Sequence, residues 1–311
     1  MQSTQSLKRR IRAVINTAQI TKAMEMVAAN KMRKSQVVAL NSRPYAIKSL
    51  ELLRELTKRT SVIPSLMKTP ETKKENKPLI ILICADKGLA GSFNSNVFRK
   101  FEKKFGGEKG SYVYAAVGKK AEEYLSRKNI PAQTSFIKFG DHAAPEETQT
   151  FANFIIDGFL AGNWSKIITV STYFRTTLRQ DVLIRELLPV TFNAIDRDIK
   201  EIAPEHGRFA PTSEDAGCHI FENYGYLIEP TTKKGSVKLI ENLSKHLVEM
   251  MMYHLILESN ASEHSARMVA MKNASDNASE LKDDLQLIFN KSRQAGITRE
   301  LAEITAGANI N

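Results

Sequence analysis

Cysteine is scarce in this chain. Only Cys84 and Cys218 occur among its 311 residues, they are far apart, and no C-x-x-C pair is present. This excludes a zinc site built from the cysteines of one chain, and the distance between the two cysteines argues against a thiol switch. Sparse cysteine use is typical of proteins in a reducing compartment, so we expect exposure to the cytosol.

Long hydrophobic runs are also missing. One of the longest, Leu79 to Ala85, is far shorter than the roughly 18 apolar residues that are needed to span a bilayer. The N-terminal segment lacks the apolar stretch of a secretory signal. Hydrophobic residues make up 42% and charged residues 25% of the chain, which is ordinary globular composition. We therefore expect a folded protein that does not insert into a membrane by itself.

The common catalytic and ligand motifs are absent as well. The sequence contains no G-x-x-x-x-G-K-[ST], no G-x-S-x-G and no H-E-x-x-H, and His246, His254 and His264 are not spaced as metal ligands on one helical turn. Gly88 and Gly91 form only a G-x-x-G, at a place where α/β folds bind phosphates. Glycines that permit a tight turn are the simpler explanation. We expect no catalytic residue, no cofactor and no metal ion.

Glycine and proline are nearly absent from the first sixty residues. Between Ser3 and Thr60 there is no glycine and one proline, Pro44, which predicts a long helix. Apolar residues recur there at helical spacing in two runs separated by one phase slip. The first run is Leu7, Ile11, Val14 and Ala18, and the second is Ile20, Met24 and Val27.

The last seventy residues carry a matching pattern. Steps of three and four from Ile240 follow a coiled-coil seam, which predicts a helix from about 236 to 305, roughly 100 Å long. The seam residues are Ile240, Leu243, Leu247, Met250, His254, Leu257, Ala261, His264, Met268, Met271, Ser275, Ala278, Lys282, Leu285 and Phe289. Residues 1–60 have 13 basic and 3 acidic residues, whereas residues 236–311 have 8 and 10. Opposite charge beside an apolar seam favours pairing of the two helices as an antiparallel coiled coil.

The middle of the chain alternates between strand and helix patterns. Strands are predicted at 79–85, 112–117, 135–139, 166–173 and 221–228, and helices at 94–105, 119–128, 145–160 and 177–188. This alternation predicts a mostly parallel sheet covered on both faces, as in a doubly wound, Rossmann-like α/β domain. The expected organisation is an N-terminal coiled-coil helix at 1–60, a linker at 61–78, the α/β domain at 79–229 and a C-terminal coiled-coil helix at 230–311.

The net charge of +11 raises nucleic acid as a partner. The basic residues near the N-terminus have no aromatic interleaving, no helix-turn-helix spacing and no glycine-aromatic motif of single-strand binders. A solvated face of the coiled coil, or a basic surface that meets acidic protein partners, also explains them. Two rival classes, an α/β enzyme with helical extensions and a nucleic-acid module, have no positive support.

Small residues are frequent on both terminal helices, for example Ala28 and Ala29 on the first and Ser262, Ser265 and Ala266 on the second. They either let two helices approach closely, so that the rod is thin, or reflect helix preference alone. Helix preference explains alanine but not the serines and asparagines between 259 and 279.

Four stretches resemble the gamma subunits of F-type ATP synthases in the same order along the chain. They are Ile20 to Lys34, Asp86 to Asn94, Ala266 to Asn277 and Asn290 to Leu301. The resemblance covers essentially the whole chain. It implies a non-catalytic central rotor shaft, whose coiled coil enters the hexamer of alpha and beta subunits. Its lower part would stand with the epsilon subunit on the membrane c-ring, so the chain would be peripheral to the cytoplasmic face of a bacterial plasma membrane.

The resemblance also implies partner contacts at six residues. Met24 with nearby basic residues, and Glu263 and Arg267 opposite, match the motif that faces the beta-subunit lever. Lys87 and its turn match a second stator-facing site, and Arg293 and Gln294 match a pair that meets a loop of the catalytic subunits. Met24 could instead pack in the seam, Arg293 could lie on a solvated face, and Glu263 and Arg267 could simply pair with each other at i, i+4. The stretch 190–217 is longer than in the family, which leaves the contacts at the foot of the shaft open.

Overall fold

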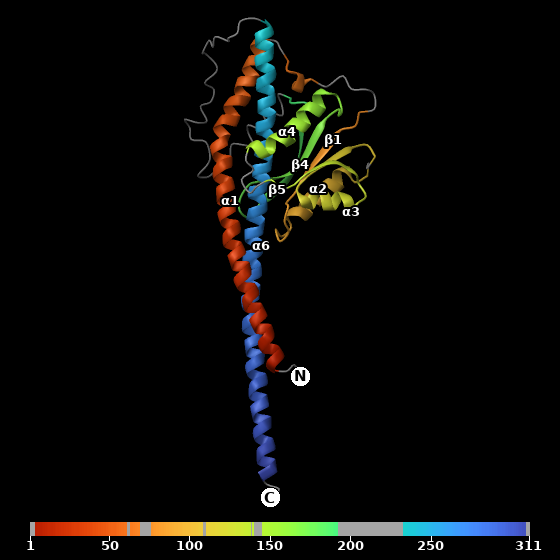
Figure 1. Cartoon of the computed structure of the whole chain (residues 1–311). Coiled ribbons are helices and arrows are strands. Elements are labelled where there is room, and N and C mark those ends of the chain that lie inside the picture. Colours follow the sequence, from red (N-terminus) through yellow and green to blue (C-terminus); the bar gives the residue numbers. More distant parts are fainter. Residues whose placement is uncertain are drawn as a thin grey trace.

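The computed structural model describes residues 4–60, 63–68, 76–107, 110–137, 139, 145–191 and 233–308. Two long helices, α1 (Thr4–Thr60) and α6 (Lys233–Ala308), lie side by side and run in opposite directions, with an α/β domain attached to one side of the pair (Figure 1). The 76 residues of α6 correspond to about 114 Å of helix at 1.5 Å per residue. The predicted rod built from both termini is confirmed.

The seam between the two helices follows the predicted spacing. Leu7, Ile11 and Leu285 form a buried cluster, against which Val14 and Phe289 pack. On α6, the buried or partly buried residues Met271, Ser275, Ala278, Lys282 and Leu285 follow one another in steps of three and four. The hydroxyl of Ser275 donates to the carbonyl oxygen of Ala18 at 3.4 Å. These contacts define an antiparallel coiled coil.

The phase slip predicted in the N-terminal helix is wrong. The seam continues without interruption through Thr21, Glu25, Ala28 and Met32, all of them buried or partly buried. Ile20 is 61% exposed and Val27 is 53% exposed, so these two belong to a separate outer stripe. Polar side chains can occupy seam positions here because each forms a hydrogen bond or ion pair with a residue three or four positions earlier in the same helix. Thr21 Oγ1 donates to the carbonyl oxygen of Thr17 at 2.9 Å, and Glu25 pairs with Lys22 at 3.0 Å.

The described part of the α/β domain is built on five strands in the order β3-β2-β1-β4-β5. They are β1 (Leu79–Ile83), β2 (Val113–Val117), β3 (Ala132–Phe136), β4 (Ile167–Phe174) and β5 (Gln180–Leu188). The first four are parallel, and β5 pairs antiparallel with β4. The strand β1 is buried along its whole length, as expected for the centre of a sheet that is covered on both faces.

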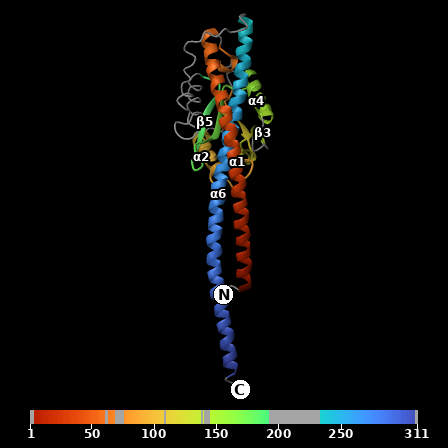
Figure 2. The same cartoon turned by 90° about the vertical axis from the view of Figure 1, so that its left-hand side faces the viewer.

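Helices cover the two faces of the sheet. Alternate residues of β1 point to opposite faces. Leu79, Ile81 and Ile83 pack with residues of α4 (Pro145–Leu160) and α6, whereas Ile80 and Leu82 pack with α2 (Phe93–Phe105) and α3 (Lys119–Arg127). The long helix α6 is therefore both half of the rod and one layer of the domain, as the two views of Figures 1 and 2 show.

Two predictions within the domain need correction. The segment 177–188 is not a helix: residues 180–188 form the strand β5 and pair with β4, and residues 177–179 lie in the turn between the two strands. The strand expected at 135–139 begins at Ala132. The strand expected at 221–228, the long stretch 190–217 for the most part, and the domain boundary at 229 lie outside the described residues.

The middle of α6 is enclosed on nearly all sides. Between Met252 and Arg267 most residues are buried, because α1 covers one side of the helix and the sheet covers another. Beyond Ser275 only one stripe of α6 is buried, against α1. None of the helices within the described ranges has an apolar stretch long enough to cross a bilayer.

Candidate partner-contact site

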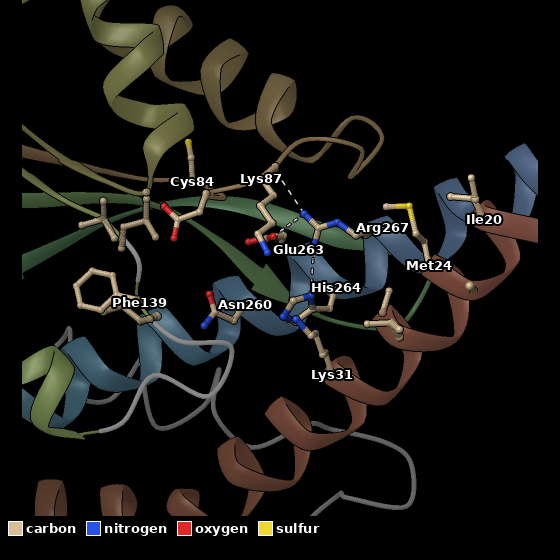
Figure 3. A pocket seen from close by; sticks show the side chains of 18 residues that line it. Ile20, Met24, Lys31, Cys84, Lys87, Phe139, Asn260, Glu263, His264 and Arg267 are labelled. Carbon is tan, nitrogen blue, oxygen red and sulfur yellow. Dashed lines mark hydrogen bonds and ion pairs between the residues drawn. The ribbon is translucent and has the colours of Figure 1, made fainter. Parts of the chain in front are cut away.

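Four of the six predicted contact residues lie around one cavity. It has a volume of about 660 Å³ and is bounded by α1, by α6 and by the carboxyl ends of β1 and β2 (Figure 3). Met24 reaches it from α1, Lys87 from the turn after β1, and Glu263 and Arg267 from α6. Residues more than 200 positions apart in the chain thus meet at one place.

Arg267 is the most extensively bonded of these four residues. Its Nη2 lies 2.6 Å from Oε1 of Glu263, and the two side chains are largely buried. The same nitrogen donates to the carbonyl oxygens of Lys87 at 3.3 Å and Gly88 at 3.2 Å, and Nη1 lies 3.3 Å from Nδ1 of His264. The i, i+4 pairing of Glu263 with Arg267 is therefore present. Arg267 also anchors the turn after β1 to the shaft, because Nη2 has a second N–H, which the two backbone carbonyls share.

That turn packs closely against α6. Gly91 has a φ of +56°, a left-handed conformation that favours glycine, and a Cβ there would lie 3.5 Å from the Cβ of Ala270. Ala90 and Phe93 form a small buried cluster with Ala85, against which Ala266 packs. The small residues of α6 at this level let the turn approach the helix backbone.

The polar side chains of the turn are used within the fold. Oδ1 of Asp86 accepts a hydrogen bond at 2.8 Å from the backbone N–H of Lys119, in the first turn of α3. The preceding residue, Gly118, has no side chain to cap that helix, and a Cβ there would lie 2.1 Å from the carbonyl oxygen of Cys84. Oδ1 of Asn94 accepts from the N–H of Ala85 at 3.1 Å. The side-chain oxygens of Asp86 and Asn94 thus stabilise the fold around the turn.

Cys84 lines the same cavity. Burial raises the pKa of its thiol well above the usual value, and the negative charge of Glu263 raises it further. The thiolate is the reactive form of cysteine, so the thiol is poorly suited to act as a nucleophile or a redox switch. Among the described residues, no group of three His, Cys, Asp or Glu side chains could hold a metal ion.

The walls of the cavity are largely apolar and its rim is charged. Ile20, Met24 and Val27 line it from α1, so the outer stripe of that helix, which includes Met24, faces the cavity. Ile83, Val117 and Phe139 line it from the α/β domain, and Lys31 and Lys87 add positive charge. Two of the three residues of the stripe are mostly exposed, and Met24 is half-buried. Such a surface can bind an apolar or acidic element of another protein.

Arg293 and Gln294 lie apart from these four residues. Both are exposed on the part of α6 that continues past the beginning of α1 at Thr4, as Figure 1 shows. The last interhelical cluster, which includes Leu285 and Phe289, lies before them. Ile297, Leu301 and Ile304 are also exposed on this single-helix tip. The tip has apolar side chains that α1 does not cover.

Sequence reasoning missed one buried ion pair beside the site. Arg185 on β5 lies 3.7 Å from Glu258 on α6, measured between Nη1 and Oε2, and both side chains are largely buried. The signal in the sequence is a pair of charged residues, Arg185 and Glu186, inside an otherwise apolar stretch, Val182 to Leu188. The expectation of a helix there left the pairing of Arg185 unrecognised.

Comparisons with known proteins give one consistent result. The family described as ATP synthase matches residues 3–310. The "ATP synthase gamma chain" of Roseiflexus sp. (strain RS-1) is 36% identical over 99% of this chain and 98% of its own length, and that of Moorella thermoacetica is 34% identical over 99% of both.

Solved structures share the fold. A chain from the Euglena gracilis mitochondrial ATP synthase, in a structure of OSCP, F1 and c-ring, has a TM-score of 0.62 at 18% identity over 98% of this chain and 93% of its own. A chain from the central stalk and c-ring structure of Tetrahymena thermophila has a TM-score of 0.57 at 24% identity over 82% of this chain and 99% of its own.

Proposed function

This chain belongs to the ATP synthase gamma-chain family, and on that premise we propose that it is the shaft that couples rotation of a membrane ring to the conformational cycle of catalytic subunits. As the gamma subunit it is the non-catalytic central rotor stalk of the complex. This assignment implies protein partners at both ends of the shaft, the catalytic subunits at one end and the membrane ring at the other.

One structural observation carries the proposal. The two ends of the chain form one antiparallel rod, and α6 alone extends beyond it as a tip with exposed apolar residues. A single helix cannot bury such residues by itself, so a surrounding partner is needed. A sleeve formed by a hexamer of alpha and beta subunits would enclose this tip, and Arg293 and Gln294 would then face its inner wall.

The cavity rim is the proposed second contact with the catalytic subunits. Met24, Lys87, Glu263 and Arg267 surround a partly apolar opening with positive charge on it. A lever element of a beta subunit that is apolar and acidic would complement this surface. At the other end of the rod, next to α4, the domain would stand with the epsilon subunit on the c-ring. The whole chain would then be peripheral to the cytoplasmic face of a bacterial plasma membrane.

Asymmetry explains how such a shaft drives chemistry elsewhere. The α/β domain lies on one side of the rod (Figures 1 and 2), and the cavity lies between that domain, α1 and α6. Each beta subunit around the shaft therefore meets a different surface, and its conformational equilibrium is biased by contacts that the others lack. Rotation moves this bias from site to site, which couples torque to nucleotide binding.

Co-expression with the alpha and beta subunits of the same organism tests the proposal. We expect one stable complex that contains this chain and hydrolyses ATP, while the purified chain neither binds nor hydrolyses ATP in calorimetry with Mg²⁺. Saturable micromolar ATP binding by the chain alone, or failure to associate with alpha and beta subunits, would contradict it.

A further inference from the structure

The contacts between α6 and the sheet change character along the helix. From Ile240 to Leu257, most buried residues of α6 are apolar, with Ser244 and His254 as exceptions, and the apolar ones pack in the main core with β1, α4 and the end of β5. From Glu258 onward, the buried residues of α6 include Ser259, Ser262, Ser265 and Arg267. Apolar packing is non-directional, whereas hydrogen bonds and ion pairs hold only at one geometry. The two halves of the interface therefore constrain the shaft in different ways.

The hairpin of β4 and β5 makes directional contacts with two residues of α6. The first is Glu258, which forms an ion pair with Arg185. The second is Ser265, whose hydroxyl donates to the carbonyl oxygen of Thr177 in the hairpin turn at 2.7 Å and accepts from Nε2 of Gln180 at 3.5 Å. Glu258 and Ser265 are seven residues apart, so they lie on the same face of α6, two turns from each other. The hairpin thus contacts the helix at two points along the helix axis.

Side-chain contacts within the hairpin stabilise it around Arg185. The guanidinium of Arg185 lies 5.2 Å from the ring centre of Tyr173 on β4, and that of Arg175 lies 5.1 Å from the same ring. Arg175 also pairs with Asp181 across the hairpin at 3.1 Å. Tyr173 lies on β4 and Arg185 lies on the neighbouring strand β5. In the pairing of these strands, Tyr173 is opposite Asp181 and Arg185 is opposite Thr169. The contact with the Tyr173 ring therefore helps to orient the Arg185 side chain toward Glu258.

We propose that Arg185, Glu258 and Ser265 are positioning residues that fix the angle of the shaft relative to the α/β domain while torque passes between them. The proposal rests on the proposed rotor function. The domain turns with the foot of the stalk, and α6 carries the turn to the tip. Apolar packing alone would let α6 rotate slightly about its own axis against the sheet, whereas the contacts at Glu258 and Ser265, on the hairpin side, and those of Arg267 with the turn after β1 resist that movement. Without the hairpin contacts the angular relation between the foot and the tip would be held less tightly.

The experiment uses the complete complex, reconstituted in vesicles, with ATP hydrolysis and ATP-driven ion uptake measured on the same preparation. The central variant is Arg185→Gln with Glu258→Gln, because it removes the ion pair without leaving one buried charge unpaired. We expect assembly and ATP hydrolysis to be retained while fewer ions are transported per ATP. Single-molecule recordings with the probe on the α/β domain should show broader dwell angles than the wild type.

Three further variants separate positioning from simple stability. Arg185→Lys keeps the charge and should restore most of the ion transport per ATP. Ser265→Ala removes only the hydroxyl, so the chain still folds, and it should broaden the dwell angles less than the double variant does. Lys166→Gln with Glu186→Gln removes an exposed ion pair between β4 and β5 within the sheet, 3.1 Å long, and should change neither measurement.

The outcomes are distinct. If the double glutamine variant and Ser265→Ala both transport as many ions per ATP as the wild type, with unchanged dwell angles, the positioning role is wrong. If the wild-type complex itself shows no rotation of the α/β domain, the proposed rotor function fails instead.

Discussion

Arg267 donates from Nη2 to the carbonyl oxygen of Gly88 at 3.2 Å, although the two residues are 179 positions apart in the chain. This contact joins the shaft to the turn that follows β1. The same guanidinium pairs with Glu263, so the ion pair on α6 and the backbone of the turn lie together in the wall of the cavity.

Replacing Arg267 by Ala should destabilise the isolated chain. The change removes the guanidinium that pairs with the largely buried Glu263 and donates to two backbone carbonyl oxygens, so we expect a loss of about 2–4 kcal/mol. Denaturant unfolding measures it. Lys272→Ala, at an exposed position on the same helix, is the control and should stay within about 0.5 kcal/mol of the wild type. Equal effects of the two changes would contradict the anchoring role of Arg267.

The seam gives a matched pair of leucines only two residues apart. Leu285 is 4% exposed and packs against Leu7 and Ile11, whereas Leu287 is 62% exposed. We expect Leu285→Ala to cost about 2–3 kcal/mol and Leu287→Ala to cost less than about 0.5 kcal/mol in the isolated chain. Hydrogen exchange should also become faster in residues 4–14 for Leu285→Ala alone. A larger effect at Leu287 would mean that the helices pair in another register.

The thiol of Cys84 should react slowly in the native chain. Because its pKa is raised, almost none of it is thiolate near pH 7–8, and the fraction increases only at higher pH. Iodoacetamide labelling followed by mass spectrometry at several pH values measures the rate. A cysteine introduced by Ser126→Cys at an exposed position of α3 is the comparison. Fast labelling of Cys84 at pH 7, at a rate similar to that of the introduced cysteine, would show that the site is open to solvent.

The rod was predictable because its signal is local and long. Seam positions recur over more than forty residues of α6, so a few polar members such as Ser275 did not obscure the pattern. On α1 the prediction failed at Ile20 and Val27. Apolar residues were assigned to the seam there, although Thr21 and Glu25 occupy it. Which face of a helix is covered depends on neighbours that are distant in sequence.

The strand β5 illustrates a limit of a different kind. Its residues Val182, Leu183, Ile184, Leu187 and Leu188 fit a helical face as well as a buried strand, and pairing with β4 decides between them. The cavity could not be predicted from the residues alone either. Met24, Lys87 and Arg267 were each singled out by resemblance, but their meeting at one cavity depends on the packing of α6 against the sheet.

The pair Arg293 and Gln294 should matter only in the complex. Both side chains are exposed and lie outside the interhelical seam, so Arg293→Ala with Gln294→Ala should leave the isolated chain as stable as the wild type. In the complex it should lower ATP hydrolysis or coupled ATP synthesis, because a contact that differs among rotational states is lost. Lys291→Ala, also exposed and one helical turn or less away, is the control. If the double variant assembles and keeps wild-type rates of both reactions, the pair is only a solvated part of the helix.

The most direct measurement is the rotation of this chain relative to the catalytic subunits. The complex is immobilised through its beta subunits, and a probe is attached to the exposed Ser126 position on the α/β domain. With ATP present, we expect the probe to turn in one direction in discrete steps, since in the proposed arrangement the shaft meets the beta subunits of the hexamer in succession. ATP hydrolysis by the complex while the probe remains at one angle would contradict the rotor function.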